Sequence, residues 1–279
     1  MNWTTRLQNV DRRIIYLLLL IACSWPLINP IGIKLQVNSS TEAVFNIIEK
    51  LNPATDTVLL DFDYSPGTGL DAQVVPVAIV EHLAARNIKW VGVSFVPEGP
   101  LMCDRLTTGI NLEGRGKVYG TDFVNLGYMA GGENAVRLFA LDCFVIPTDT
   151  RGNTVANLPI MQGKQTVKDF AFVMQFNAGG PETWVRQVVD PMGIPFALGT
   201  VTVSVPSALP YYDSGQIKGL LGGLRAAAEY ELLNGKPGQG ASMMDAQSMA
   251  HLLILAFIAI GNVAYFVDKR NKKPGQTVN

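Results

Sequence analysis

A set of residues able to bind a ligand stands at or just after the segments expected to be strands. They are Asp61, Asp63, Ser65, Ser94, Glu98, Asn177, Gly179, Gly180, Tyr211 and Ser214. In open sheets of parallel strands, ligands bind in the crevice outside the carboxyl ends of the strands. Carboxylates, hydroxyls and backbone N–H groups collected there could hold a small polar molecule, so the sequence predicts a ligand crevice. Loops also need polar and turn-forming residues for their own geometry, and that alternative stays open.

The sequence Asp61-Phe62-Asp63 raises the question of catalysis. Two carboxylates at a strand end resemble the Asp-x-Asp start of the haloacid-dehalogenase-like phosphatases, and Ser94 would fit their second motif. That family also needs a downstream acidic cluster that holds magnesium, and no convincing acidic pair follows here. Strand alternation favours a buried, hydrogen-bonded Asp61 over a nucleophile. We assign no catalytic residue, expect no cofactor, and find no cysteine or histidine spacing that predicts a metal site.

Ser204 and Ser214 allow a second catalytic interpretation, that of a membrane-anchored serine-type peptidase. Neither serine lies in a Gly-x-Ser-x-Gly elbow, which argues against that interpretation. A triad would have to use His82, whose place in a helical pattern is typical of a structural residue. A serine–lysine pair with Lys168 or Lys218 is compatible with the spacing, so a hydrolase stays open as an alternative.

These residues need a scaffold, and the pattern of the chain predicts one. Expected strands at 57–64, 90–96, 170–176 and 196–205 alternate with expected helices at 74–85, 101–112, 133–141 and 182–189. The strands read as nearly continuous apolar runs, which is typical of strands covered on both faces. The sequence therefore predicts an α/β fold: a mostly parallel, doubly wound, Rossmann-like sheet with helices on both faces. Residues 147–164 are rich in turn formers and are expected to form a long surface excursion.

Residues 214–233 are predicted to form one long helix. Small residues recur at every fourth position of it: Gly215, Gly219, Gly223 and Ala227. Each glycine destabilises a helix by about 1 kcal/mol relative to alanine, so this strip predicts a closely packed neighbour. The neighbour is either the sheet of the same domain or a second subunit, in which case the chain is a homo-oligomer.

Both ends of the chain carry long apolar segments. Residues 249–267 contain no Asp, Glu, Lys or Arg and are about as long as a bilayer-spanning helix. Residues 14–33 form a second apolar run behind a pair of arginines, so we expect a transmembrane helix at each end. Cys23 keeps open the alternative that the first run is the signal of a lipoprotein. Asn262 is expected to face another helix, because an unpaired amide in lipid is unfavourable.

Charge is distributed unevenly along the chain. Residues 1–34 and 249–279 each carry four basic side chains and one acidic side chain, whereas residues 35–248 carry 14 basic and 21 acidic ones. Short basic flanks remain on the cytoplasmic side of a membrane. We therefore expect cytoplasmic ends at 1–13 and 268–279, and an extracytoplasmic domain at 34–248. The acidic domain disfavours binding of nucleic acid.

Four stretches carry a resemblance to a known group of proteins. They are VSFVPEGP at 93–100, VNLGY at 124–128, PYYDSGQIKGLLGGLRAAAEYELL at 210–233, and MMDAQSMAHLLILAFIAIGNVAYF at 243–266. They resemble prokaryotic membrane proteins that hold an extracytoplasmic α/β domain between two transmembrane helices and have no assigned activity. The resemblance implies a two-pass protein of the inner membrane. With it we predict a non-catalytic structural, interaction or sensing component of a membrane complex; an extracytoplasmic small-ligand-binding protein is the other alternative.

Overall fold

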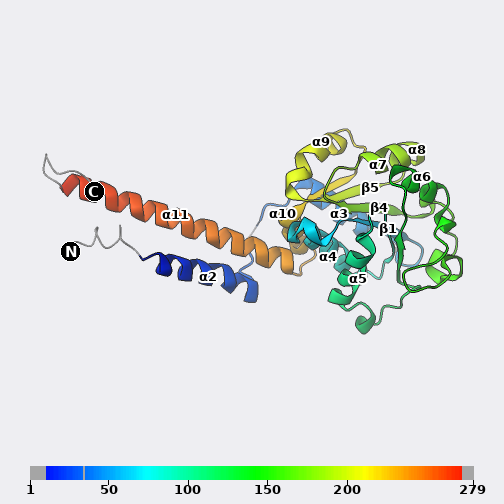
Figure 1. Cartoon of the computed structure of the whole chain (residues 1–279), viewed down its shortest axis with the longest axis horizontal. Helices are drawn as coiled ribbons and strands as arrows, with labels where there is room; N and C mark the ends of the chain where they lie inside the picture. Colours follow the sequence, from blue (N-terminus) through cyan, green and yellow to red (C-terminus); the bar gives the residue numbers. More distant parts are fainter. Residues whose placement is uncertain (1–10, 34, 272–279) are drawn as a thin grey trace. The chain divides into compact units, whose positions relative to one another are not determined.

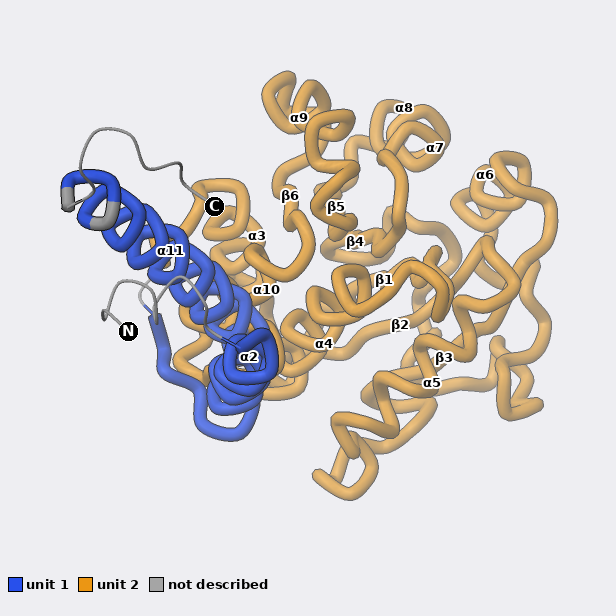
Figure 2. The backbone as a smooth tube through the Cα atoms, turned by 60° about the vertical axis from the view of Figure 1, so that its left-hand side comes forward, with its two compact units in different colours: residues 1–34, 241–279 blue, residues 35–240 orange. Residues whose placement is uncertain are grey.

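The computed structural model describes residues 11–33 and 35–271. The chain forms two compact units (Figure 2): residues 1–34 together with 241–279, and residues 35–240. The larger unit contains the sheet, and the smaller one contains the apolar ends of the chain.

The described part of the larger unit contains one sheet of six strands, all parallel, in the order β3-β2-β1-β4-β5-β6. The strands are β1 (Thr57–Asp63), β2 (Lys89–Ser94), β3 (Phe123–Tyr128), β4 (Phe172–Asn177), β5 (Phe196–Thr200) and β6 (Gly219–Gly222). The predicted parallel Rossmann-like sheet is thereby confirmed. The strand order reverses between β1 and β4, which is the switch point where such sheets form their ligand crevice.

Helices cover both faces of the sheet (Figure 1). One face carries α3 (Ser39–Glu49), α4 (Leu70–Ala85), α5 (Gly99–Ile110) and α10 (Gly223–Leu233). The other carries α6 (Glu133–Leu141), α7 (Glu182–Trp184), a π-helical turn (Val185–Val189), α8 (Asp190–Met192) and α9 (Val205–Asp213). The alternation of strand side chains explains this arrangement, because Leu59 of β1 lies in the buried cluster with Phe139 and Trp184 of the second group.

The segment between α6 and β4 corrects one expectation. Four short 3₁₀ turns lie in this segment: Cys143–Val145, Val155–Asn157, Pro159–Met161 and Val167–Asp169. Outside it, the described residues form 3₁₀ turns at Pro66–Thr68, Glu113–Arg115 and Thr202–Ser204. Residues 147–164 were expected on the surface, yet Val155 and Met161 are fully buried in the core cluster. Apolar side chains spaced between turn formers let an irregular segment fill the core without a regular element.

The predicted long helix at 214–233 is wrong. Helix α9 ends at Asp213, the chain turns at Gly215, and Lys218 N donates to Phe196 O as β6 joins the sheet. Helix α10 begins only at Gly223, so the small residues do not share one helix face.

Two of the glycines nevertheless permit close packing within the domain. A side chain at Gly219 would collide with Val44 of α3, which packs against β6 at this point. Gly223 has a φ of +57° and faces Asp71, so it needs both the conformational freedom and the absence of a side chain. Ala227 is fully buried in α10. These glycines therefore pack within the domain, although not as a strip on one helix, and the expected homo-oligomer stays a prediction.

The smaller unit contains α2 (Arg12–Ile28) and most of α11 (Gln239–Asn271). The first two residues of α11 belong to the larger unit. Within the described residues, α11 is the one helix that is long and apolar enough to cross a membrane. In the described part of the chain, α2 does not qualify as the expected second span, because it has only 17 residues, about 25 Å against a hydrocarbon layer of about 30 Å. The helix ends at Ile28 because Asn29 precedes Pro30, and a residue before proline disfavours the helical conformation.

A buried carboxylate connects the two helices of the smaller unit. Asp245, which is 3% exposed, accepts hydrogen bonds from three successive backbone N–H groups, those of Ile31, Gly32 and Ile33, at 2.8 to 3.1 Å. Successive N–H groups of this kind form a concave site for an anion, and here the anion is a side chain of the same chain. The segment after α2 is therefore held against the beginning of α11.

Candidate functional site

Asp61 lies in the core and not in an open crevice. Its side chain is 0% exposed, and its Oδ2 accepts hydrogen bonds from Gln175 Nε2 at 3.0 Å and from Trp184 Nε1 at 2.6 Å. Burial, and then the negative charge of Asp63, raises the pKa of Asp61 well above its usual value. The other oxygen of the carboxyl group, Oδ1, is buried and has no hydrogen-bond partner among the described residues. The expected buried carboxylate is confirmed.

Asp63 and Ser94 use their polar atoms to join the ends of β1 and β2. Asp63 Oδ1 accepts from Phe95 N at 2.7 Å and from Ser94 Oγ at 3.2 Å. The same hydroxyl is within 3.0 Å of the carbonyl oxygens of Phe62 and Val96. These contacts hold the strand ends together and already occupy Asp63 Oδ1 and the Ser94 hydroxyl.

The loop after β4 is closed by its own hydrogen bonds. Asn177 Nδ2 donates to Gly180 O at 2.9 Å, and Gly179 N donates to Asn177 Oδ1 at 3.1 Å. Thr200 and Ser204, at and after the end of β5, donate their hydroxyls to Gly179 O and Ala178 O. The predicted polar groups are present at the switch point, but they bind one another.

Asp71 connects three loops at this edge of the sheet. It is the second residue of α4, and its carboxylate accepts from Thr202 N and Thr202 Oγ1 after β5, and from Leu224 N after β6. A helix start beside a glycine-rich loop is where Rossmann domains hold the pyrophosphate of a dinucleotide. Here an acidic side chain with three donors of its own occupies that position.

The remaining predicted crevice residues lie apart from one another. Ser65 is half-buried, and its carbonyl oxygen accepts from Thr68. Glu98 is exposed just before α5. Tyr211 and Ser214 were expected beside the others, and that expectation is wrong. Helix α9 carries the chain back to the amino end of the sheet, where Tyr211 O accepts from Ile217 N just before β6 begins.

His82 does not join either serine considered for a hydrolase. His82 is 1% exposed between α3 and α10, where its ring nitrogens lie 2.7 Å from Tyr230 Oη and 2.8 Å from Glu49 Oε1. Ser204 lies in the loop after β5, and Ser214 Oγ donates to Tyr211 O at the end of α9. Neither serine is hydrogen-bonded to His82, so the structure brings no such triad together.

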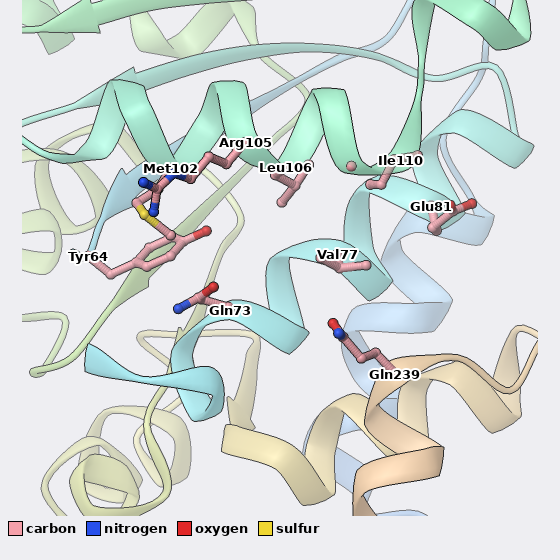
Figure 3. Close-up of a pocket in the computed structure, with 10 residues that line it drawn as sticks. Tyr64, Gln73, Val77, Glu81, Met102, Arg105, Leu106, Ile110 and Gln239 are labelled. Atoms are coloured by element: carbon pink, nitrogen blue, oxygen red, sulfur yellow. The ribbon is translucent and has the colours of Figure 1, made fainter. Parts of the chain in front are cut away.

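A groove between α4 and α5 is the more open site (Figure 3). Its volume is about 350 Å³, within the range of ligand pockets. Val77 of α4 and Met102 and Leu106 of α5 line its apolar middle. Tyr64, the first residue after β1, lies between the two helices at one end of the groove, and Arg105 of α5 lies at the same end.

The sequence analysis did not identify Asp71, Tyr64 or Arg105. The start of α4 after a glycine was a signal for Asp71, since an acidic residue in the first helical turn is common. Strand alternation from Phe62 places Tyr64 on the face that α4 and α5 cover. Nothing in the local sequence marks Arg105.

Comparison with known proteins does not indicate a function for this chain. No family model, no curated protein and no solved structure matches the chain.

Proposed function

We propose that the protein is a membrane-anchored, non-catalytic component of a prokaryotic membrane complex, with an α/β domain that serves interaction or sensing. The observation that carries this proposal is the exposed apolar surface of α11. Large apolar side chains that are 41–65% exposed run along it: Leu252, Ile254, Leu255, Ile258, Ile260, Val263, Tyr265 and Phe266. A surface of this size in water would be unfavourable, and a bilayer is the solvent that suits it.

The basic end of α11 sets the proposed orientation. Lys269 and Arg270 follow the apolar segment at once, and Lys272 and Lys273 come soon after. The positive-inside rule places this end in the cytoplasm and the α/β domain on the far side. Helix α2 begins with Arg12 and Arg13 and exposes its own apolar side chains, so it would enter the same lipid layer beside α11.

The hydrogen bonds at the strand ends support a role without catalysis. Asp63, Ser94, Asn177 and Asp71 each bind groups of the protein itself, so the edge of the sheet is cross-linked. A rigid edge of this kind suits a domain that presents a surface. Self-association would involve the helices of the smaller unit, because Asn262 is exposed within the apolar stretch of α11 and needs a polar partner in lipid.

A membrane-insertion assay tests the proposal. Replacing both Leu255 and Ile258 by Arg places two charges in the middle of the apolar segment, each unfavourable by about 2.5–3.5 kcal/mol. The matched control replaces Val118 and Leu141, two exposed apolar residues of the α/β domain, by Arg. We expect the wild-type chain and the control to remain in washed membranes and the α11 variant to be lost from them.

A reporter fused after Asn279 tests the orientation separately. It should be active in the cytoplasm, whereas a protease added outside should reach the α/β domain. Recovery of the wild-type chain from the cytosol without detergent would contradict the anchor, and a reporter active only outside would contradict the orientation.

A further inference from the structure

The side chain of Tyr64 is buried at the edge of the groove between α4 and α5. Tyr64 is 3% exposed, and its Oη makes no hydrogen bond to any residue that the structure describes. Burial raises the pKa of Tyr64, so the hydroxyl keeps its proton and can donate. The hydroxyl points into a groove large enough for a ligand (Figure 3), where an acceptor on that ligand would satisfy it.

Arg105 supplies an unpaired positive charge at the same end of the groove. Its guanidinium has neither a hydrogen bond nor an ion pair within the described part of the chain. The neighbouring Asp104 is occupied by Asn125, which donates to its Oδ1 at 2.8 Å. A guanidinium and a hydroxyl that converge on one space favour a carboxylate, which accepts from both.

The rest of the groove determines what is attached to that carboxylate. Val77, Met102 and Leu106 give it an apolar middle, and its volume of about 350 Å³ corresponds to roughly a dozen atoms the size of water. At the far end (Figure 3), Glu81 is already paired with Arg115 at 2.8 Å. A second charge on the ligand would therefore find no free partner there.

We propose that this groove binds a small monocarboxylate with a short apolar chain. The carboxylate lies against Arg105 and the Tyr64 hydroxyl, and the chain lies over Val77, Met102 and Leu106. This site goes beyond the proposed function, and it does not depend on the orientation of α11 in the membrane.

Calorimetry with hexanoate as the probe tests the site, on the full chain in lipid nanodiscs with empty nanodiscs as the blank. We expect saturable one-to-one binding of hexanoate, and none of hexylamine or hexanol at the same concentration. Arg105→Gln removes the charge and should weaken binding at least about tenfold, since hydrogen bonds to charged groups contribute more than neutral ones.

Two further variants separate binding from folding. Tyr64→Phe removes only a hydroxyl without a partner, so it should leave the thermal midpoint of the free chain unchanged and weaken hexanoate binding about two- to tenfold. Arg137→Gln on α6 changes an exposed arginine on the opposite face of the sheet and should leave binding unchanged. Absence of saturable binding at millimolar hexanoate, equal affinity for hexylamine, or binding that both groove variants leave unaltered would overturn the proposal. Membrane attachment is measured on the same preparation, so either proposal can fail without the other.

Discussion

Asp61 should make the domain less stable at neutral pH than it would be with asparagine in its place. Asparagine has the same shape, and its Oδ1 can accept from Gln175 and Trp184 as Asp61 Oδ2 does. Its amide group takes the place of Asp61 Oδ1, which has no hydrogen-bond partner among the described residues. The substitution Asp61→Asn thus keeps the hydrogen bonds and removes the titration.

The sign and size of the effect follow from linkage between folding and protonation. The folded chain holds a proton on Asp61 that the unfolded chain, with an ordinary pKa of 3.8, has lost. The contribution of Asp61 to stability is fully present below pH 3.8 and is lost as the pH rises, by about 1.4 kcal/mol for each pH unit over which the folded chain keeps the proton. Between pH 5 and 7 the advantage of Asp61→Asn should therefore grow by up to about 2.7 kcal/mol, or roughly 5–11 °C in thermal midpoint for a domain of this size.

Thermal unfolding of the full chain in detergent, followed by tryptophan fluorescence at several pH values, measures this difference. Asp213→Asn is the control for a change of charge, because Asp213 is exposed at the end of α9. Asp61→Ala should instead destabilise the domain by about 2–4 kcal/mol at every pH, since two buried donors lose their acceptor. If wild type and Asp61→Asn give parallel pH curves, Asp61 is not protonated in the folded chain and the reasoning is refuted.

Two other carboxylate contacts give predictions that can be checked in the same way. Burial lowers the pKa of His82 more than the contact with Glu49 raises it, so the folded chain binds fewer protons than the unfolded chain below pH 6.5, the ordinary pKa. The free energy of unfolding should therefore fall by at most about 1.4 kcal/mol for each pH unit below that value. A urea titration of His82→Gln should lack this acid slope, and an unchanged slope would contradict the assignment. Asp71→Ala removes the acceptor of Thr202 and Leu224 and should reduce the free energy of unfolding by about 1–3 kcal/mol, whereas an unchanged thermal midpoint would show that the tie between the loops is not stabilising.

The sequence by itself determined the class of the fold and the location of most elements. Apolar runs five to eight residues long between glycine- and proline-rich loops are strong local signals, and they placed β1, β2, β4 and β5. Helix α6, Glu133–Leu141, was predicted with its observed bounds, because a glycine pair precedes it and its apolar residues repeat at helical spacing. The long apolar α11 likewise depends only on composition.

Only the tertiary structure decided what β6 is and where the candidate site lies. The short sequence GLLG from Gly219 fits a helix as well as a strand, and pairing with β5 settles the choice through long-range hydrogen bonds. Asp71 meets Thr202 and Leu224 across 131 and 153 residues, and Tyr64 and Arg105 line one groove only because α4 and α5 pack on the same face of the sheet. Contacts between distant segments depend on how whole elements pack, and neither residue type nor local spacing contains that information.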